Sequence, residues 1–176
     1  GTDSGIYRWC EAEQRWTHLP GPLDTTCTWT LARRKDDPNV IVAGTQPAAL
    51  YRSDDGGVNW RQLPAQFATE CIFVHQPRVT QAIFDPEQPD TLWAGVEIDA
   101  IHRSRDGGNS WDRLDQGLIS GDVHGVTVVR TPAGRVLFAT TNKGLHRSDD
   151  EGESWQMQTL DSPWQYTRSV GARADG

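Results

Sequence analysis

The sequence has few basic residues and no long apolar run. Its 176 residues include 17 Lys and Arg against 24 Asp and Glu, which gives a formal net charge of −7. A surface with this charge does not favour the phosphate backbone of nucleic acids, so we expect no nucleic-acid partner. No stretch approaches the roughly 18 consecutive apolar residues that suggest a membrane-spanning helix, so we expect no membrane partner either.

Cysteine is scarce as well. The three cysteines, Cys10, Cys27 and Cys71, have no CxxC spacing and cannot all pair within one chain. A reducing compartment suits them best, so a cytoplasmic location is favoured, while a single disulfide remains open. The chain also lacks metal-ligand spacings, a phosphate-binding loop, a dinucleotide fingerprint and a nucleophile elbow. We therefore expect neither a metal nor a cofactor.

An eight-residue pattern, Ser-x-Asp-x-Gly-x-(Ser/Thr/Asn)-Trp, occurs three times, each time after a short stretch that ends in arginine. Its Asp can accept backbone N–H bonds in a tight turn, and its Gly suits a positive φ. Its Trp can bury a large ring between neighbouring sheets. We interpret the pattern as a structural turn rather than a binding site. The residues concerned are Ser53, Asp55, Gly57 and Trp60; Ser104, Asp106, Gly108 and Trp111; and Ser148, Asp150, Gly152 and Trp155.

The copies recur every 44 to 51 residues, a period that suits a propeller blade of four strands. Short β-branched and aromatic runs alternate with Gly, Pro, Asn and Asp too often for helices to form. We predict an all-β fold, a β-propeller of four-stranded antiparallel blades in a single domain or fragment over residues 1–176. The three complete blades are expected at 26–63, 79–114 and 124–160, a partial blade at 1–20, and the first strand of a further blade at 166–176.

The partial blades leave two arrangements open. The last strand could complete the N-terminal blade and close a four-bladed ring. Alternatively, the chain is a fragment of a longer propeller that a second chain or missing residues complete. Some closure is expected because open sheet edges promote aggregation, and we favour the fragment.

The eight-residue pattern resembles the Asp-box of the bacterial-neuraminidase-repeat (BNR) superfamily. Nearly the whole chain resembles BNR-like β-propellers of the sialidase, sortilin and photosystem-assembly-factor kind. The segments at 43–57, 85–97 and 121–125 are especially similar to bacterial repeat proteins labelled glycosyl hydrolase or sialidase. The resemblance implies that the boxes lie on the propeller face away from the ligand. A typical sialidase is not expected, because the repeated arginines adjoin every box and no FRIP-like motif precedes the first one.

The loops on the other face then hold the candidate residues. The loop 64–79 is longer than its counterparts and contains Glu70, His75 and Arg78, which makes it the first candidate for binding. An ordinary covering loop is the alternative. Glu97 and Asp99 form a carboxylate pair that could serve acid–base chemistry, as in sugar hydrolysis, although a solvated turn is the simpler reading.

Two further groups precede innermost strands. Asp122 and His124 could point into the central channel, where a hydrogen-bonded rim histidine is the simpler reading. Trp164, Tyr166 and Arg168 could form a platform for stacking sugars, or the place where another blade packs.

These observations favour a binding scaffold for a protein segment or a carbohydrate, on the face opposite the boxes. The alternative is a glycoside hydrolase or polysaccharide lyase with carboxylate and histidine acid–base residues at the rim. Its candidate catalytic residues would be Glu70, Glu97, Asp99, Asp122 and His124.

Overall fold

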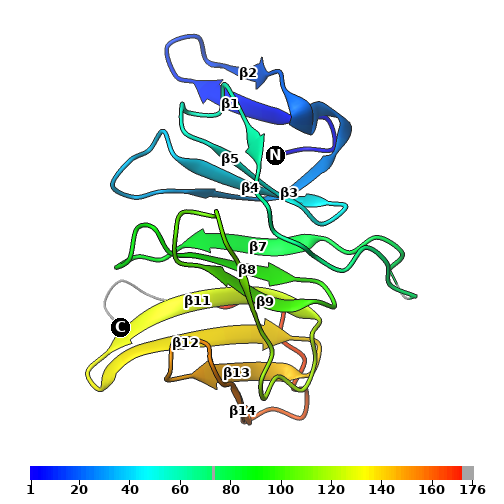
Figure 1. The fold of residues 1–176 in the computed structure, drawn as a ribbon, viewed down its shortest axis with the longest axis vertical. Helices are drawn as coiled ribbons and strands as arrows, with labels where there is room; N and C mark the ends of the chain where they lie inside the picture. Colours follow the sequence, from blue (N-terminus) through cyan, green and yellow to red (C-terminus); the bar gives the residue numbers. More distant parts are fainter. Residues whose placement is uncertain (73, 172–176) are drawn as a thin grey trace.

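The chain forms a stack of antiparallel β-sheets (Figure 1). The computed structural model describes residues 1–72 and 74–171. A two-stranded hairpin, β1 (Ile6–Cys10) and β2 (Arg15–Leu19), comes first and is followed by a 3-10 helix, η1 (Pro22–Thr25). Within the described residues, no helix is long and apolar enough to cross a membrane.

Three four-stranded sheets follow the hairpin, each built from consecutive strands that pair antiparallel in chain order. Sheet I contains β3 (Cys27–Arg33), β4 (Ile41–Gln46), β5 (Leu50–Ser53) and β6 (Arg61–Gln62). Sheet II contains β7 (Val79–Phe84), β8 (Leu92–Val96), β9 (Ala100–Ser104) and β10 (Asp112–Leu114). Sheet III contains β11 (Val123–Thr131), β12 (Gly134–Thr141), β13 (Gly144–Ser148) and β14 (Gln156–Gln158). The prediction of an all-β chain with four-stranded antiparallel sheets is confirmed.

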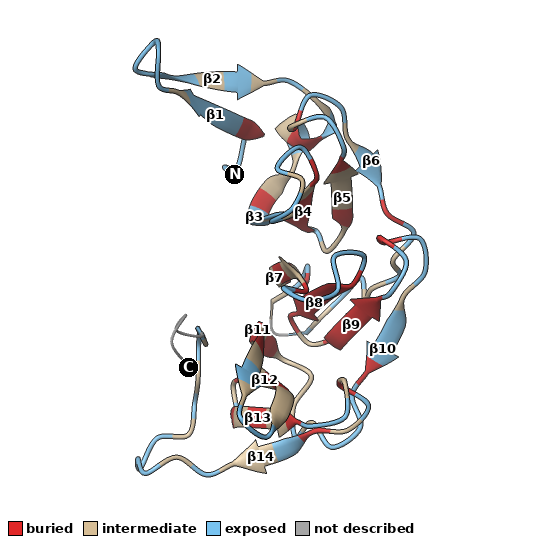
Figure 2. Ribbon diagram, turned by 90° about the vertical axis from the view of Figure 1, so that its left-hand side faces the viewer, coloured by how far each residue is buried: buried red, intermediate tan, exposed pale blue. Residues whose placement is uncertain are grey.

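The sheets are arranged in an arc, as Figure 2 shows. The first strands β3, β7 and β11 line its concave side, and the fourth strands β6, β10 and β14 lie on its convex side. Each sheet packs face to face on the next, so the hydrophobic core is divided into layers between sheets. Trp93 on β8 is the largest fully buried side chain and belongs to the layer between sheets II and III.

Close approach of the sheets depends on glycine at one position of the second strand. A Cβ on Gly44 would lie 2.7 Å from the Cβ of Val79 in sheet II. A Cβ on Gly95 would lie 2.8 Å from Cγ1 of Val123 in sheet III. Because real Cβ atoms do not approach this closely, the missing side chains allow the first strand of the next sheet to pack directly against them.

The eight-residue turns connect the third and fourth strands, and the turn of sheet II shows their construction. Asp106 Oδ1 accepts hydrogen bonds from Ser104 Oγ at 2.7 Å and from the backbone N–H of Ser110 at 2.9 Å. Ser104 Oγ accepts the N–H of Gly108 at 2.8 Å, and Gly108 has a φ of 97°. Trp111 closes the turn by donating its indole N–H to the Gly108 carbonyl at 3.1 Å. The acidic side chain is therefore engaged inside its own turn.

In sheets I and II, the arginine before the turn connects its sheet to the next one. Arg52 of sheet I donates from Nη1 to the Gly107 carbonyl in the turn of sheet II, at 2.8 Å. Arg103 of sheet II donates in the same way to the Glu151 carbonyl of sheet III, at 2.5 Å. Arg52 and Arg103 thus bind the backbone of the turn in the next sheet.

The C-terminal segment differs from the strand expected at 166–176. Residues 166–171 have no assigned strand, and 172–176 lie outside the described residues. The N–H of Thr167 nevertheless donates to the carbonyl of Thr141 at 3.2 Å, so the segment runs past the end of β12. The single disulfide left open by the sequence does not involve Cys10 or Cys27, which form no disulfide in the structure.

His146 makes the stability of sheet III dependent on pH. Burial lowers the pKa of this fully buried imidazole, and a hydrogen bond to the Gly144 carbonyl opposes the shift only in part. A histidine with a lowered folded-state pKa contributes its full stability above the unfolded value of about 6.5, and this contribution falls as the pH drops below that value. We expect urea denaturation of the wild type at pH 7.5 and pH 5.5 to show a larger loss of stability than His146→Gln shows. His75→Asn, in an exposed loop, should behave like the wild type.

Candidate ligand-binding site on the concave side

The first strand of every four-stranded sheet contains a β-bulge near its start. The pairing register shifts by one residue between Thr28 and Thr30, and equivalent shifts occur in β7 and β11. A bulge releases one residue from the ladder and redirects its side chain, often beside a functional site. The three bulge residues are Trp29, Thr80 and His124. They occupy equivalent positions on the strands that line the concave side.

At the first bulge, Trp29 carries an arginine on its ring. The Cζ atom of Arg78 lies 4.1 Å from the Trp29 ring centroid, and Arg78 Nη2 donates to Oε1 of Glu97 at 2.6 Å. Glu97 is only 6% exposed, and its Oε2 has no hydrogen-bond partner among the described residues. Trp29 is 46% exposed. The guanidinium of Arg78 is therefore stacked on the accessible ring of Trp29 and is held in place by its bond to the buried Glu97.

At the third bulge, His124 contacts both Asp122 and the C-terminal segment. Its Nδ1 lies 2.7 Å from the carbonyl oxygen of Thr167. Because a carbonyl only accepts, the proton must be on Nδ1. Nε2 lies 3.4 Å from Oδ1 of Asp122, and the ring centroid is 5.2 Å from that of Tyr166. The Cζ atom of Arg168 lies 5.7 Å from the ring centroid of Tyr166. Four predicted site residues therefore meet here, while Trp164 is 80% exposed to solvent.

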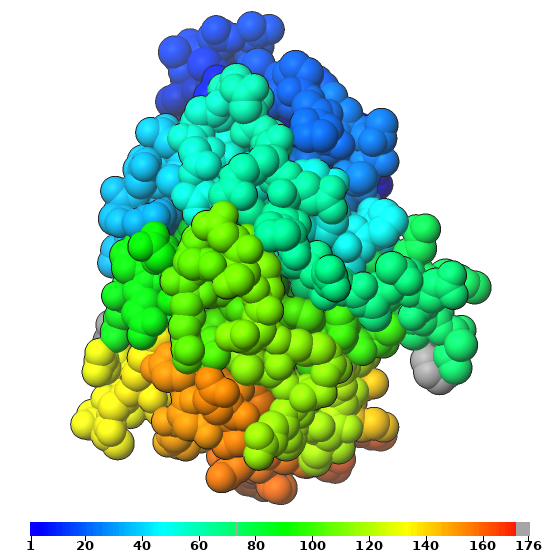
Figure 3. Space-filling view, viewed as in Figure 1, coloured from blue at the N-terminus to red at the C-terminus, as the bar shows by residue number. Residues whose placement is uncertain are grey.

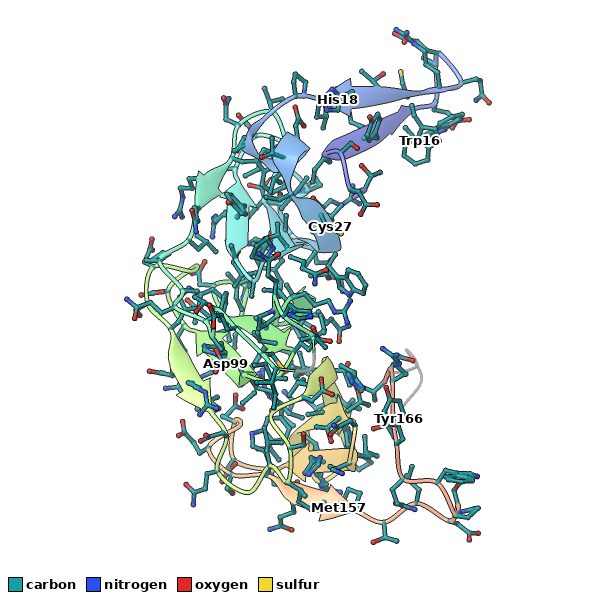
Figure 4. The ribbon with its side chains drawn as sticks, turned by 90° about the vertical axis from the view of Figure 1, so that its right-hand side faces the viewer. Trp16, His18, Cys27, Asp99, Met157 and Tyr166 are labelled. Atoms are coloured by element: carbon teal, nitrogen blue, oxygen red, sulfur yellow. The ribbon has the colours of Figure 1, made fainter. Side chains whose placement is uncertain are left out.

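Glu97 and Asp99 do not face each other, although only one residue separates them. Asp99 accepts the N–H of Ala68 at 2.8 Å and Nε of Arg113 at 2.9 Å, and lies 3.3 Å from Nε2 of His102. Burial alone would raise the pKa of Asp99, but the bonds from His102, Ala68 and Arg113 outweigh it and hold that pKa at about 2. In Figure 4, Asp99 lies towards the convex side, away from Tyr166 on the concave side. Each carboxylate thus has its own arginine.

The long loop after sheet I projects from the body of the molecule, as its green tip shows in Figure 3. Its chain reverses through a backbone pair between Cys71 and His75, and the side chain of Ile72 is 88% exposed. Glu70 and His75 line an open hollow of about 690 Å³ formed by this loop. Gln46 Nε2 donates to the Gln76 carbonyl at 2.8 Å, which fixes the base of the loop beside sheet I.

Two residues of the concave side escaped the sequence analysis. Trp29 and Thr80 align with His124 in the repeat, so an alignment of the repeats could have predicted that they occupy equivalent positions on the concave side. Thr80 Oγ1 donates to the Val123 carbonyl at 2.7 Å, just as His124 donates to Thr167 one sheet later. Within residues 1–72 and 74–171, no group of three or more His, Cys, Asp or Glu could hold a metal ion.

The fold is that of β-propeller proteins, as similar solved structures show. No family model matches the chain. A GH74 enzyme of Niastella koreensis superposes with a TM-score of 0.76 at 17% identity, over 99% of this chain and 29% of its own. YCF48 bound to D1 peptide superposes with a TM-score of 0.59 at 17% identity, over 93% of this chain and 49% of its own.

A curated relative points the same way. The chain is 21% identical over 169 residues to an oligoxyloglucan-reducing end-specific xyloglucanase of Emericella nidulans, which covers 86% of this chain and 21% of the relative. The chain therefore spans about a fifth of that enzyme's length, and less than a third of the Niastella enzyme's. At these identities, the likeness to the solved structures establishes the fold alone.

Proposed function

We propose that the chain is a BNR-type, Asp-box part of a β-propeller that acts as a binding scaffold. Its sheets I, II and III are the blades at 26–63, 79–114 and 124–160. The ligand, a protein segment or a carbohydrate, binds at the concave side, towards the edge opposite the eight-residue turns. The observation that carries this proposal is the fixed pair of Arg78 and Trp29. A planar cation stacked on an exposed ring can contact a sugar face, a backbone carbonyl or a carboxylate without further ordering.

The surroundings of Glu97 and Asp99 argue against acid–base catalysis by this carboxylate pair. A general acid must carry a proton near neutral pH, which requires a raised pKa in a carboxyl group. Asp99 has a pKa of about 2, so it is ionised, and three donors already engage it. Glu97 is bound to Arg78 and buried beneath it. Both side chains hold other residues in position.

The glycoside hydrolase or polysaccharide lyase remains the second candidate, and one pair of residues favours it. Asp122 and His124 lie 3.4 Å apart on the concave side, and Asp122 Oδ1 is buried. Such a pair could move a proton if a second carboxylate, such as Glu70, approached the same substrate. The similar proteins named above include one xyloglucanase and one protein bound to a peptide, which supports both ligand classes for this fold.

Removing either partner of the stacked pair should weaken binding, and Trp29→Ala does so without leaving the buried Glu97 unpaired. We expect Arg78→Ala and Trp29→Ala to lower affinity for the ligand about tenfold or more, since such a contact contributes about 1–2 kcal/mol. The probes are xyloglucan oligosaccharides and a library of extended peptides, and the measurement is titration calorimetry. Arg105→Ala is the matched control, because Arg105 is an exposed arginine of the turn in sheet II, with its side chain 56% exposed.

The same preparation separates the two functions. Binding of a probe that persists in Arg105→Ala, fails in Arg78→Ala and releases no new reducing ends supports the scaffold. Steady release of reducing ends or unsaturated sugars that stops in Asp122→Asn or Glu70→Gln would establish the enzyme instead.

A further inference from the structure

The two ends of the sheet stack present the two halves of an interface that recurs inside the chain. We call the face of each sheet that meets the next sheet its trailing face, and the opposite one its leading face. On the trailing face of sheet I, Val42 and Leu50 are 0% exposed because sheet II covers them. From the same face, Arg52 reaches the turn of sheet II.

Sheet III has the same trailing face without a following sheet among the described residues. Phe138, Leu145 and Arg147 are equivalent to Val42, Leu50 and Arg52 in the repeat, and cross-strand pairing of Phe138 with Arg147 places them on one side. All three are half-buried.

The arginine of this face turns back on its own sheet. Arg147 pairs with Asp149 at 2.6 Å, as Arg52 pairs with Asp54 at 2.7 Å, but Arg52 also binds a carbonyl of the next turn. The trailing face of sheet III therefore offers an apolar surface with a cation at the place where the next turn would lie.

The hairpin offers the complementary leading face. Cross-strand pairing puts Tyr7 opposite His18 and Trp9 opposite Trp16, on the side away from sheet I. The ring centroids are 5.0 Å apart in the first pair and 5.5 Å apart in the second. Trp16 is 64% exposed and Trp9 40%. Tyr51, which is equivalent to Tyr7, packs beneath the hairpin in the internal interface. Figure 4 shows Trp16 and His18 at one end of the arc and Met157 of sheet III at the other.

The turn of the hairpin supplies the charge that this interface needs. It spans eight residues, like the other turns, and the Trp9 indole N–H donates to Glu11 Oε2 at 2.7 Å where the others use serine and aspartate. Glu13 lies in the same turn. In the internal interface, Arg103 binds both a carbonyl of the next turn and the carboxylate of Glu153, at 2.8 Å. The hairpin turn at residues 9–16 would offer an arginine of another sheet the same two kinds of acceptor, a backbone carbonyl and a carboxylate.

We propose that a second copy of this chain docks head to tail, its hairpin covering the trailing face of sheet III. Tyr7, Trp9 and Trp16 of one copy would pack on Phe138 and Leu145 of the other. Arg147 would then bind the hairpin turn while it keeps Asp149, as Arg52 binds the turn of sheet II while it keeps Asp54. The interface is heterologous, so two copies close a ring if the rotation permits and otherwise extend.

Light scattering after size exclusion tests this association. The wild type should elute with at least twice the mass of one chain at micromolar concentrations. We call the hairpin the head and the trailing face of sheet III the tail. Trp16→Glu disrupts the head, and Leu145→Glu disrupts the tail. Arg147→Glu is a second tail variant at a half-exposed site, in case Leu145→Glu does not fold. Because every head-to-tail contact needs one intact hairpin and one intact face of sheet III, each variant alone should elute as a monomer.

Mixing the variants distinguishes the head-to-tail contact from a symmetric one. Trp16→Glu keeps an intact tail and Arg147→Glu keeps an intact head, so an equimolar mixture should form a heterodimer joined by one wild-type interface. Ile72→Glu, on the projecting loop, should leave the wild-type mass unchanged. A monomeric wild type at every concentration would overturn the proposal, as would variants that keep the wild-type mass or a mixture that forms no heterodimer.

Discussion

Asp85→Ala is expected to lower the free energy of unfolding by about 3–5 kcal/mol, the range for breaking a buried ion pair. The Asp85 side chain is completely buried and forms a bidentate pair with Arg135 of sheet III. Its Oδ2 also accepts the Trp93 indole N–H at 2.9 Å. Removal of the carboxylate leaves the indole N–H and two guanidinium nitrogens of Arg135 without this acceptor, between sheets II and III, while Arg135 Nε stays 3.0 Å from Glu151 Oε1. Urea denaturation at pH 7 measures the effect.

Two variants control for this result. Asp85→Asn keeps the shape and one acceptor oxygen, so it should lose less stability than Asp85→Ala. Asp90→Ala removes a carboxylate that is 72% exposed, from the same turn between β7 and β8, and should change stability by less than about 0.5 kcal/mol. A loss below about 1 kcal/mol in Asp85→Ala would mean that this pair does not connect the two sheets.

Asp106→Ala is expected to destabilise the chain by about 2–3 kcal/mol and to leave ligand binding intact. Asp106 accepts four hydrogen bonds within its turn, from Ser104, Asn109 and Ser110, and each is worth about 0.5–1.5 kcal/mol. Water replaces part of them because the turn is at the surface. Thermal unfolding gives the loss, and calorimetry below the transition gives the affinity.

The pH dependence of this effect follows from the same bonds. The side-chain and backbone bonds from Ser110, with that from Ser104, hold the pKa of Asp106 well below its ordinary range. A carboxyl with a lowered folded-state pKa stabilises the fold above its unfolded value of about 3.9, and this contribution is lost as the pH falls through the folded-state value. The stability difference between the wild type and Asp106→Ala should therefore shrink below about pH 4. A constant difference from pH 6 to pH 2 would contradict the argument.

The repeat made the fold predictable, because each copy of the pattern states the same local preference. Ser104, Asp106 and Gly108 encode a turn within five residues of chain, and the period of the copies implies a sheet for each. These are local interactions, which sequence patterns carry well. The packing of sheets on one another then follows from the apolar strands on either side.

The candidate site was harder to predict because it depends on contacts between sheets. Arg78 stacks on Trp29, which lies 49 positions earlier in the sequence, and no spacing of residues predicts that contact. The separation of Glu97 from Asp99 depends on the turn between them, where Ile98 has a φ of 63°. A β-branched residue rarely adopts that conformation, so no propensity suggests it. Asp122 and His124 were candidates from the sequence because both lie next to the start of one strand, β11.

The measurement that tests the account most directly is a titration of the chain with its ligand, followed through the tryptophan indole N–H signals in an NMR spectrum. The chain has eight tryptophans, of which Trp29 lies on the concave side and Trp60, Trp111 and Trp155 close the eight-residue turns. We expect the Trp29 signal to shift in proportion to bound ligand while the three turn signals stay in place. Shifts of the turn signals with Trp29 unmoved would show that the ligand binds at the turns, and would contradict the assignment of those turns to structure alone.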